Sequence, residues 1–203
     1  MIAFRLILIV VMGLTAAGCA QTLGSHQASL QTVEMLRSSN IPPMRVGQFA
    51  LAPGRPSSMD RSVGIRSVSL SSPDGASFAE YLGKVLETDL RAAGKLDPNS
   101  NLIVQGLLTD SDVSAGIADG AASLGAKFSL LREGKTVFEK TLTVHSEWGS
   151  SFVGAIAIPD AVNHYSSLYE ALILQLLADQ DFKSALIPSG RTSFLRTKQF
   201  AEN

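Results

Sequence analysis

The sequence predicts an α+β domain, in which an antiparallel-rich sheet of about five strands carries two long helices on one face, with a short helix near the N-terminus. Segments 77–93 and 159–179 repeat their apolar residues with the helical period, and each has one broad apolar stripe. Several shorter segments alternate apolar and polar residues with the period of a strand. Because each helical stripe needs an apolar surface to cover it, these patterns favour helices packed on a sheet.

The first part of the domain is predicted to contain a helix and two strands. Segment 29–39 has apolar residues at helical spacing and ends before a pair of prolines, which forbid its continuation. Segments 44–51 and 63–70 have the composition of strands. The apolar phase changes inside 63–70, so we expect a bulge or break near Arg66.

The clearest helix spans 77–93. Ser77 and Glu80 have the spacing of a capping box, and Gly94 supplies a left-handed stop. The nearly continuous apolar segment 102–108 predicts a strand covered on both faces or central in the sheet. We expect the preceding strand, this helix and strand 102–108 to form one right-handed crossover.

A hairpin is predicted after a polar loop over 110–120. Its strands are 124–130 and 138–144, joined by a tight reversal in which Gly134 takes a positive φ. Lys140 interrupts the apolar face of the second strand, and the opposite face is polar.

Segment 148–158 is unusually apolar for a loop, and Pro159 suits the first turn of the long helix that follows, which ends near Asp179. Its large side chains require the loop to fold onto the core, to contact a partner, or to touch lipid. The residues of this candidate contact surface are Trp148, Phe152, Val153 and Ile156.

The chain divides into four segments. Residues 1–18 have a charged start, a short apolar core and small residues at the end, as a secretory signal peptide does. Residues 19–28 form a short polar tether, residues 29–186 a single α+β domain, and residues 187–203 a tail without periodicity that we expect to be disordered.

Cys19 directly follows Ala16-Ala17-Gly18, which resembles the lipobox of bacterial lipoproteins. Ala16 stands where that pattern usually has Leu. The resemblance implies cleavage between Gly18 and Cys19, attachment of a diacylglyceryl group to the thiol, and acylation of the new amino group. The alternative is a plain secretory signal followed by an incidental cysteine.

Composition excludes several function classes. The formal net charge is −1, so nothing favours nucleic acid as a partner. Cys19 is the only cysteine, which leaves no disulfide, redox pair or zinc-cysteine site. None of the three histidines has metal-ligand spacing, and Asp110 and Asp112 lack the glycine and glutamate of a calcium loop. We expect no metal and no cofactor.

No catalytic group is assigned. Ser150 and Ser151, with His145 and Asp160, supply the residue types of a serine hydrolase, but the spacing does not match a nucleophile elbow. We interpret the serines as part of a turn, with an enzyme as the open alternative.

Segments 44–49, 72–82 and 148–159 resemble a family of small proteobacterial envelope lipoproteins, most of them uncharacterised, over about residues 32–186. Some members carry the label UDP-N-acetylglucosamine acyltransferase. Enzymes of that name are built from hexapeptide repeats, and this chain has no six-residue period. The order of elements is also similar to lipoproteins that assist lipopolysaccharide assembly or lipid-transporting ABC systems.

We therefore expect a non-enzymatic lipoprotein of the cell envelope. Ala20 after the cysteine, rather than Asp, resembles the pattern sorted to the periplasmic face of the outer membrane. Its expected partners are the membrane, through the lipid anchor, and an envelope protein or lipid. The alternatives are the acyltransferase or hydrolase, and a small-ligand carrier with an apolar pocket between helices and sheet.

Overall fold

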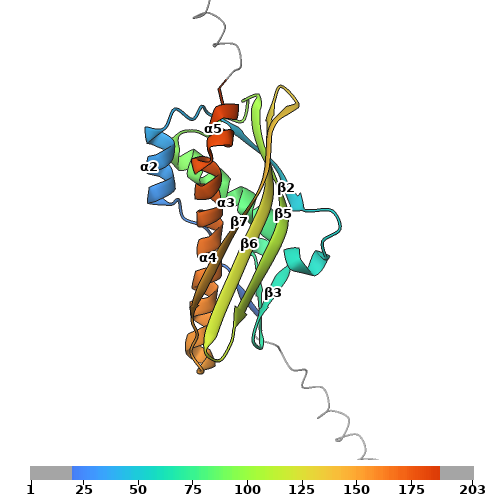
Figure 1. Ribbon diagram of the computed structural model, residues 1–203, viewed down its shortest axis with the longest axis vertical. Helices are drawn as coiled ribbons and strands as arrows, with labels where there is room; N and C mark the ends of the chain where they lie inside the picture. The colour runs from blue at the N-terminus through green and yellow to red at the C-terminus, as the bar shows by residue number, and fades with distance from the viewer. Residues whose placement is uncertain (1–19, 188–203) are drawn as a thin grey trace, which may run out of the picture.

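The computed structural model describes residues 20–187 and shows an α+β architecture (Figure 1). The elements in chain order are β1 (Ala20–Thr22), α2 (Leu30–Ser38), β2 (Arg45–Leu51), η2 (Ser57–Asp60), β3 (Ser62–Ile65), β4 (Val68–Ser71), η3 (Pro73–Gly75), α3 (Phe78–Ala93), β5 (Leu102–Ala115), β6 (Asp119–Arg132), β7 (Lys135–Gly149), α4 (Gly154–Ala178) and α5 (Gln180–Ala185). The predicted class is confirmed. The strand count was wrong, because the described residues form seven strands in two sheets, with orders β2-β5-β6-β7 and β1-β4-β3.

Three long antiparallel strands form most of the larger sheet (Figure 1). β6 and β7 are joined by a turn in which Glu133 and Gly134 have φ values of 51° and 78°, so the predicted reversal is confirmed. The expected polar loop over 110–120 was wrong. β5 continues to Ala115 and β6 begins at Asp119, so the β5–β6 turn lies at the opposite end of the sheet from the β6–β7 turn.

Helix α3 begins and ends where its local signals predict. The hydroxyl of Ser77 accepts a hydrogen bond from the N–H of Glu80, and the Glu80 carboxylate accepts one from the N–H of Ser77. Gly94 ends the helix at φ 71°. The helix packs against β2 and β5.

Helix α4 runs along β6 and β7 (Figure 1). It begins at Gly154, so Pro159 lies inside the helix and not in its first turn, which corrects the prediction. Pro159 cannot donate a hydrogen bond to the carbonyl of Ala155 four residues earlier. Ala155 is exposed, so water can satisfy that carbonyl.

Aromatic side chains fill the space between the helices and the larger sheet. Phe78 of α3 meets Tyr165 of α4 edge to face, with ring centroids 5.6 Å apart, and Phe128 projects from β6. All three side chains are fully buried. Each such burial contributes about 1.5–3 kcal/mol to stability.

The smaller sheet contains a hairpin, β3 and β4, where the sequence predicts a single strand over 63–70. β3 and β4 are antiparallel, and Ile65 faces Val68 across a two-residue turn in which Arg66 has a φ of 55°. The bulge or break expected near Arg66 is therefore a break, at which the chain reverses its direction. The expected crossover was also wrong, because the parallel neighbour of β5 is β2.

Residues 20–28, expected to form a tether, are packed on the domain. β1 pairs in parallel with β4, and Leu23 is 2% exposed. His26 Nε2 lies 3.0 Å from the buried carboxylate of Asp89. The predicted signal peptide and the predicted tail beyond Ile187 lie outside the described residues.

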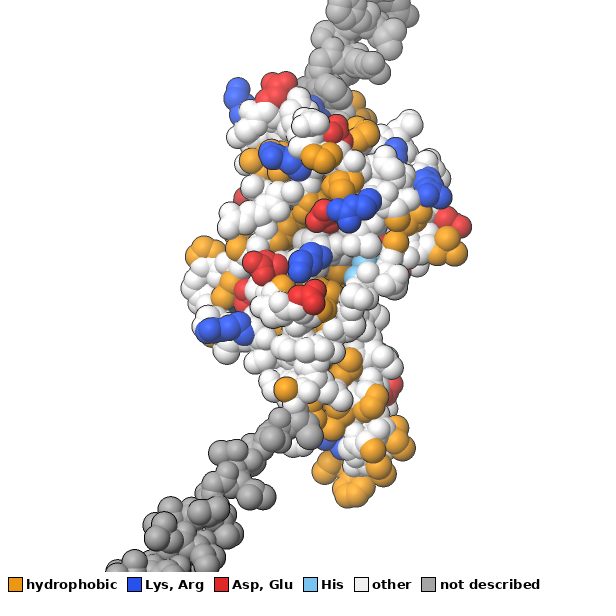
Figure 2. Space-filling model, turned by 180° about the vertical axis from the view of Figure 1, so that it is seen from behind, with side chains coloured by type: hydrophobic (Ala, Val, Ile, Leu, Met, Phe, Trp, Pro, Cys, Tyr) orange, Lys and Arg blue, Asp and Glu red, His pale blue; other side chains and the backbone are white. Residues whose placement is uncertain are grey.

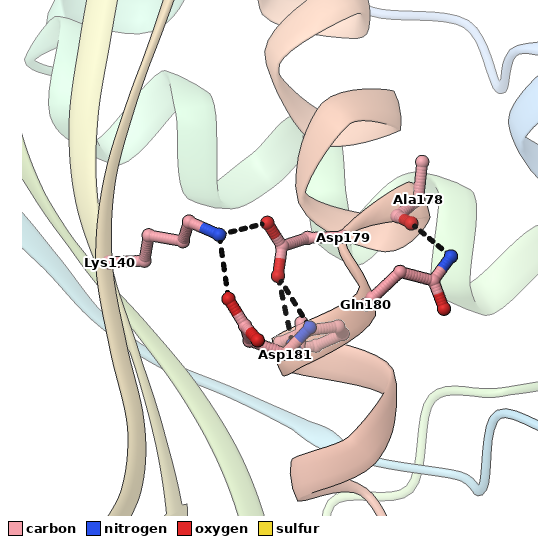
Figure 3. Close-up of polar contacts among 6 residues, drawn as sticks. Lys140, Ala178, Asp179, Gln180 and Asp181 are labelled. Atoms are coloured by element: carbon pink, nitrogen blue, oxygen red, sulfur yellow. Dashed lines mark hydrogen bonds and ion pairs between the residues drawn. The ribbon is translucent and has the colours of Figure 1, made fainter.

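Lys140 projects from β7 to the junction of α4 and α5 (Figure 3). Its Nζ donates to Asp179 Oδ2 at 2.7 Å and to Asp181 Oδ2 at 2.8 Å. The charge that interrupts the apolar face of β7 is thus paired across the edge of the sheet.

Candidate functional site

Four large apolar side chains are exposed at one end of the domain, and we call them the apolar tip. They come from two segments far apart in the sequence, the β5–β6 turn and the loop that enters α4 together with the first turn of that helix. Figure 2 shows hydrophobic side chains gathered at this lower end of the molecule. The members and their exposed fractions are Ile117 (70%), Phe152 (76%), Val153 (51%) and Ile156 (60%).

Arg66 holds the two turns of the tip together. Its guanidinium donates to the carbonyl oxygens of Ala115 at 2.8 Å and Gly116 at 2.7 Å. On the other side it donates to Ser151 at 2.6 Å and Phe152 at 3.1 Å. The β3–β4 turn, where Arg66 takes a left-handed conformation, aims this side chain between them.

Further hydrogen bonds pair the backbone of the tip internally. The N–H of Gly116 donates to the carbonyl of Asp119 at 2.8 Å, and that of Ser150 donates to Ala118 at 2.7 Å. The N–H of Val153 donates to the Ser151 hydroxyl at 3.1 Å. The two turns therefore form one connected unit rather than independent loops.

The N-terminal strand reaches the same end of the domain. Ala20 lies opposite Ser69 in the β1–β4 pair, and Ser69 is three residues from Arg66. Gly18 and Cys19, the residues of the predicted cleavage and lipidation site, lie outside the described residues. Ala20, the first residue that the structure describes, therefore lies at this end of the domain.

Trp148 does not share the exposure of its predicted partners Phe152, Val153 and Ile156. It is half-buried, and its indole covers Gly120 so closely that a Cβ there would lie 2.2 Å from Trp148 Cε2. Its ring also stacks on His164 of α4. The exposed member that the sequence reading missed is Ile117, which lay inside the segment interpreted as a polar loop.

The serine and histidine of the enzyme alternative are not brought together. His145 is exposed and forms no hydrogen bond with Ser150 or Ser151. The Ser150 hydroxyl is buried without a partner, and that of Ser151 accepts from the backbone.

A different serine and histidine are in contact, which sequence reasoning missed. Ser146 Oγ lies 2.9 Å from His164 Nδ1, while Asp160 Oδ1 is 3.8 Å from His164 Nε2, too far for a hydrogen bond. Ser146 and Trp148 are two residues apart on β7, so their side chains lie on the same face of the strand. This spacing is the sequence signal that places Ser146 beside the residues that contact Trp148. The stack and the single hydrogen bond orient the imidazole beside Trp148.

Within residues 20–187, no three His, Cys, Asp or Glu side chains cluster closely enough to hold a metal ion. One groove of about 430 Å³ lies between residues 24–27 and the helices, and it is lined largely by polar groups including Tyr81 and Glu170. The aromatic packing between helices and sheet fills the place where the small-ligand alternative required an apolar pocket. No helix in the described part of the chain is long and apolar enough to cross a membrane.

Sequence comparison finds no matching family model and no matching curated protein. The fold is similar to that of a Xanthomonas campestris protein described by the family model DUF330, with 14% identity, a TM-score of 0.51, and coverage of 78% of this chain and 94% of that one. A proposed lipoprotein from Caulobacter crescentus (13% identity, 77% and 96% covered, TM-score 0.43) and a minor lipoprotein from Acinetobacter baumannii (10%, 71% and 93%, TM-score 0.41) are more distant.

At this identity, the similarity to the Xanthomonas protein shows a shared fold and nothing further. The α+β architecture of residues 20–187 is not the left-handed β-helix of hexapeptide-repeat acyltransferases.

Proposed function

We propose that the protein is a non-enzymatic lipoprotein of the cell envelope, anchored through acyl chains on Cys19 to the periplasmic face of the outer membrane. Its domain binds an envelope protein or lipid there. The lipobox-like Ala16-Ala17-Gly18-Cys19 supports the anchor, and Ala20 supports sorting to the outer membrane.

The observation that carries the proposal is the path of the chain directly after Cys19. Ala20 already belongs to β1, and Leu23 is buried in the core three residues later. A free tether of residues 20–27 could extend about 25 Å and let the domain move away from the bilayer. Here the folded domain begins one residue after the lipid-bearing position, so a lipidated Cys19 holds the domain directly at the membrane surface.

Two variants of the full-length precursor test the anchor. Cys19→Ser removes the thiol that the diacylglyceryl group requires, whereas Ala20→Ser leaves it in place and changes only an exposed side chain of β1. We expect radiolabelled palmitate on the wild type and on Ala20→Ser, and an unlabelled, soluble Cys19→Ser form. Palmitate label on Cys19→Ser, or its absence from the wild type, would contradict the proposal.

The location is tested separately with Ala20→Asp. The side chain of Ala20 is exposed, so a carboxylate there leaves the fold intact. We expect the wild type in the outer-membrane fraction of a sucrose gradient and Ala20→Asp in the inner-membrane fraction. An unchanged distribution would contradict the proposed sorting while leaving the lipid anchor in place.

A further inference from the structure

We propose that the apolar tip inserts into the same bilayer leaflet that holds the acyl chains of Cys19, so that the domain touches the membrane at two adjacent points. This inference rests on the proposed lipid anchor and adds a second contact, made by Ile117, Phe152, Val153 and Ile156. Its ligand is the lipid bilayer surface.

The composition of the tip suits lipid. Residues 115–118 and residues 150–159, which include the start of α4, contain no charged side chain. The four large apolar side chains between them are each at least half exposed. Asp119 and Asp160 flank the turns, which limits insertion to the interfacial depth, where charged groups keep contact with water.

Backbone groups of the tip form hydrogen bonds within the protein, which favours contact with a surface poor in water. Irregular backbone is costly in contact with lipid because unpaired N–H and C=O groups lose their hydration. In the tip, the Arg66 guanidinium satisfies four carbonyl groups, and the N–H groups of Gly116 and Ser150 find carbonyl partners.

The position of the tip favours lipid over a protein partner. Ala20 pairs with Ser69 close to the β3–β4 turn, and Arg66 in that turn bonds directly to the tip. A lipid on Cys19 therefore holds the tip at the bilayer, where the high effective concentration makes even weak insertion persist. A protein partner at this end would have to displace the bilayer that the anchor keeps there.

Tryptophan reporters test the insertion. The chain has one native tryptophan, Trp148, which supplies the baseline. Phe152→Trp places a reporter in the tip. Val137→Trp places a matched reporter at a 41% exposed apolar position near the other end of β7, about 40 Å away along the strand. Both sites are exposed, so circular dichroism should remain unchanged.

Each protein, extracted from membranes in its full mature form, is reconstituted into vesicles of phosphatidylethanolamine and phosphatidylglycerol with bromine in the upper acyl chain. We expect the Phe152→Trp reporter to be quenched at least about twofold more than the Val137→Trp reporter, with emission shifted to shorter wavelength. Equal quenching at both sites would overturn the inference. A shift at Phe152→Trp that requires a second envelope protein would overturn it as well, because the tip would then be a protein-binding surface.

Mass spectrometry of the same samples separates this inference from the proposed function. If Cys19 carries acyl chains, the quenching result tests the tip alone. If Cys19 is unmodified, the anchor proposal fails, and the free thiol is coupled to a maleimide lipid in the same vesicles. Quenching at Phe152→Trp in the coupled protein would still support insertion, and its absence would overturn it.

Discussion

Trp148 of β7 stacks face to face on His164 of α4, with ring centroids 4.2 Å apart and planes inclined by 3°. The contact joins the end of strand β7 to helix α4, five residues after Pro159. Ser146 Oγ, 2.9 Å from His164 Nδ1, fixes the rotation of the imidazole. Of the five large apolar side chains in segment 148–158, Trp148 and Ile158 pack against the core, and Phe152, Val153 and Ile156 are exposed.

The stack predicts a strong effect of a methyl group at Gly120. A Cβ there would lie 2.2 Å from Trp148 Cε2, so Gly120→Ala must push the indole away from His164. We expect a loss of about 1–3 kcal/mol in the free energy of unfolding, measured by urea denaturation, together with a change in Trp148 fluorescence. Gly149→Ala is the matched control, because nothing lies within 4 Å of its Cβ position. Equal stability of the two variants would contradict the packing described for Trp148.

The hydrogen bonds of Arg66 predict that its side chain limits local opening of the apolar tip. Arg66→Gly removes the guanidinium and suits the positive φ of 55°, so the variant reports the side chain rather than backbone strain. Losing the shared donor should ease local opening by about 1–2 kcal/mol, and raise the rate of chymotrypsin cleavage after Phe152 by roughly five- to thirtyfold. Arg61→Gly is the control, because the side chain of Arg61 bonds only to Ser57. Cleavage that is equally slow in both variants would show that the turns hold together without Arg66.

The two carboxylate oxygens of Asp179 have different roles, so substitutions can separate the helix cap from the ion pair. Its Oδ1 accepts from the N–H groups of Asp181 and Phe182, which caps α5, while its Oδ2 pairs with Lys140 (Figure 3). Asp179→Asn keeps a capping oxygen and removes the charge, whereas Asp179→Ala removes both. We expect Asp179→Ala to be less stable than Asp179→Asn by about 1 kcal/mol in urea denaturation. Equal stabilities would show that the cap contributes nothing.

The same pair gives a pH dependence. Burial alone would raise the pKa of Asp179, but the hydrogen bonds from Lys140 and from the backbone together lower it. A lowered folded pKa stabilises the protein above the ordinary value of 3.8 and loses that contribution as the pH falls through the folded value. The stability difference between wild type and Asp179→Asn should therefore be largest near neutral pH and shrink toward about pH 2. A difference independent of pH would contradict this assignment.

Helix α3 could be predicted from the sequence because its signals are local. The capping box joins Ser77 to Glu80, three residues apart, and Gly94 ends the helix by its own backbone freedom. The extension of β5 and β6 into 110–120 could not be predicted in the same way. The buried residues on that part of β5 are Ser111, Val113 and Ala115, of which only Val113 is a larger apolar residue, so the apolar alternation is weak.

The partners that bury those residues come from far along the chain. The Ser111 hydroxyl bonds to Tyr165, 54 residues later, and Gly120 is covered by Trp148. The apolar tip also depends on residues that lie far apart in the sequence. Phe152 and Ile156 were visible as an apolar loop, but Ile117 joins them only because two long hairpin strands bring the β5–β6 turn beside α4. The only sequence signal at Arg66 is the change of apolar phase within segment 63–70, which does not indicate the four hydrogen bonds of its side chain.

The last prediction concerns Tyr81, Tyr165 and Tyr169, the only tyrosines in the chain. Tyr165 and Tyr169 share a hydrogen bond of 2.9 Å, and Tyr165 bonds to Ser111 at 2.7 Å. Tyr81 donates to the carbonyl of Gly24 at 3.0 Å. Burial raises the pKa of all three phenols, most strongly those of Tyr165 and Tyr169.

A raised folded pKa means that the unfolded chain loses its phenolic protons first as the pH rises above the ordinary value of 10.0. The stability is fully present below that pH, and above it each tyrosine that stays protonated in the folded chain lowers the free energy of unfolding by about 1.4 kcal/mol per pH unit. Absorbance at 295 nm should therefore show tyrosinate appearing together with the loss of circular dichroism, in one steep alkaline transition. Tyr165→Phe, which leaves Ser111 without its partner, should start from a stability lower by about 1–3 kcal/mol and unfold at lower pH. Ionisation of all three tyrosines near pH 10.0 with the circular dichroism intact would contradict the burial of this cluster.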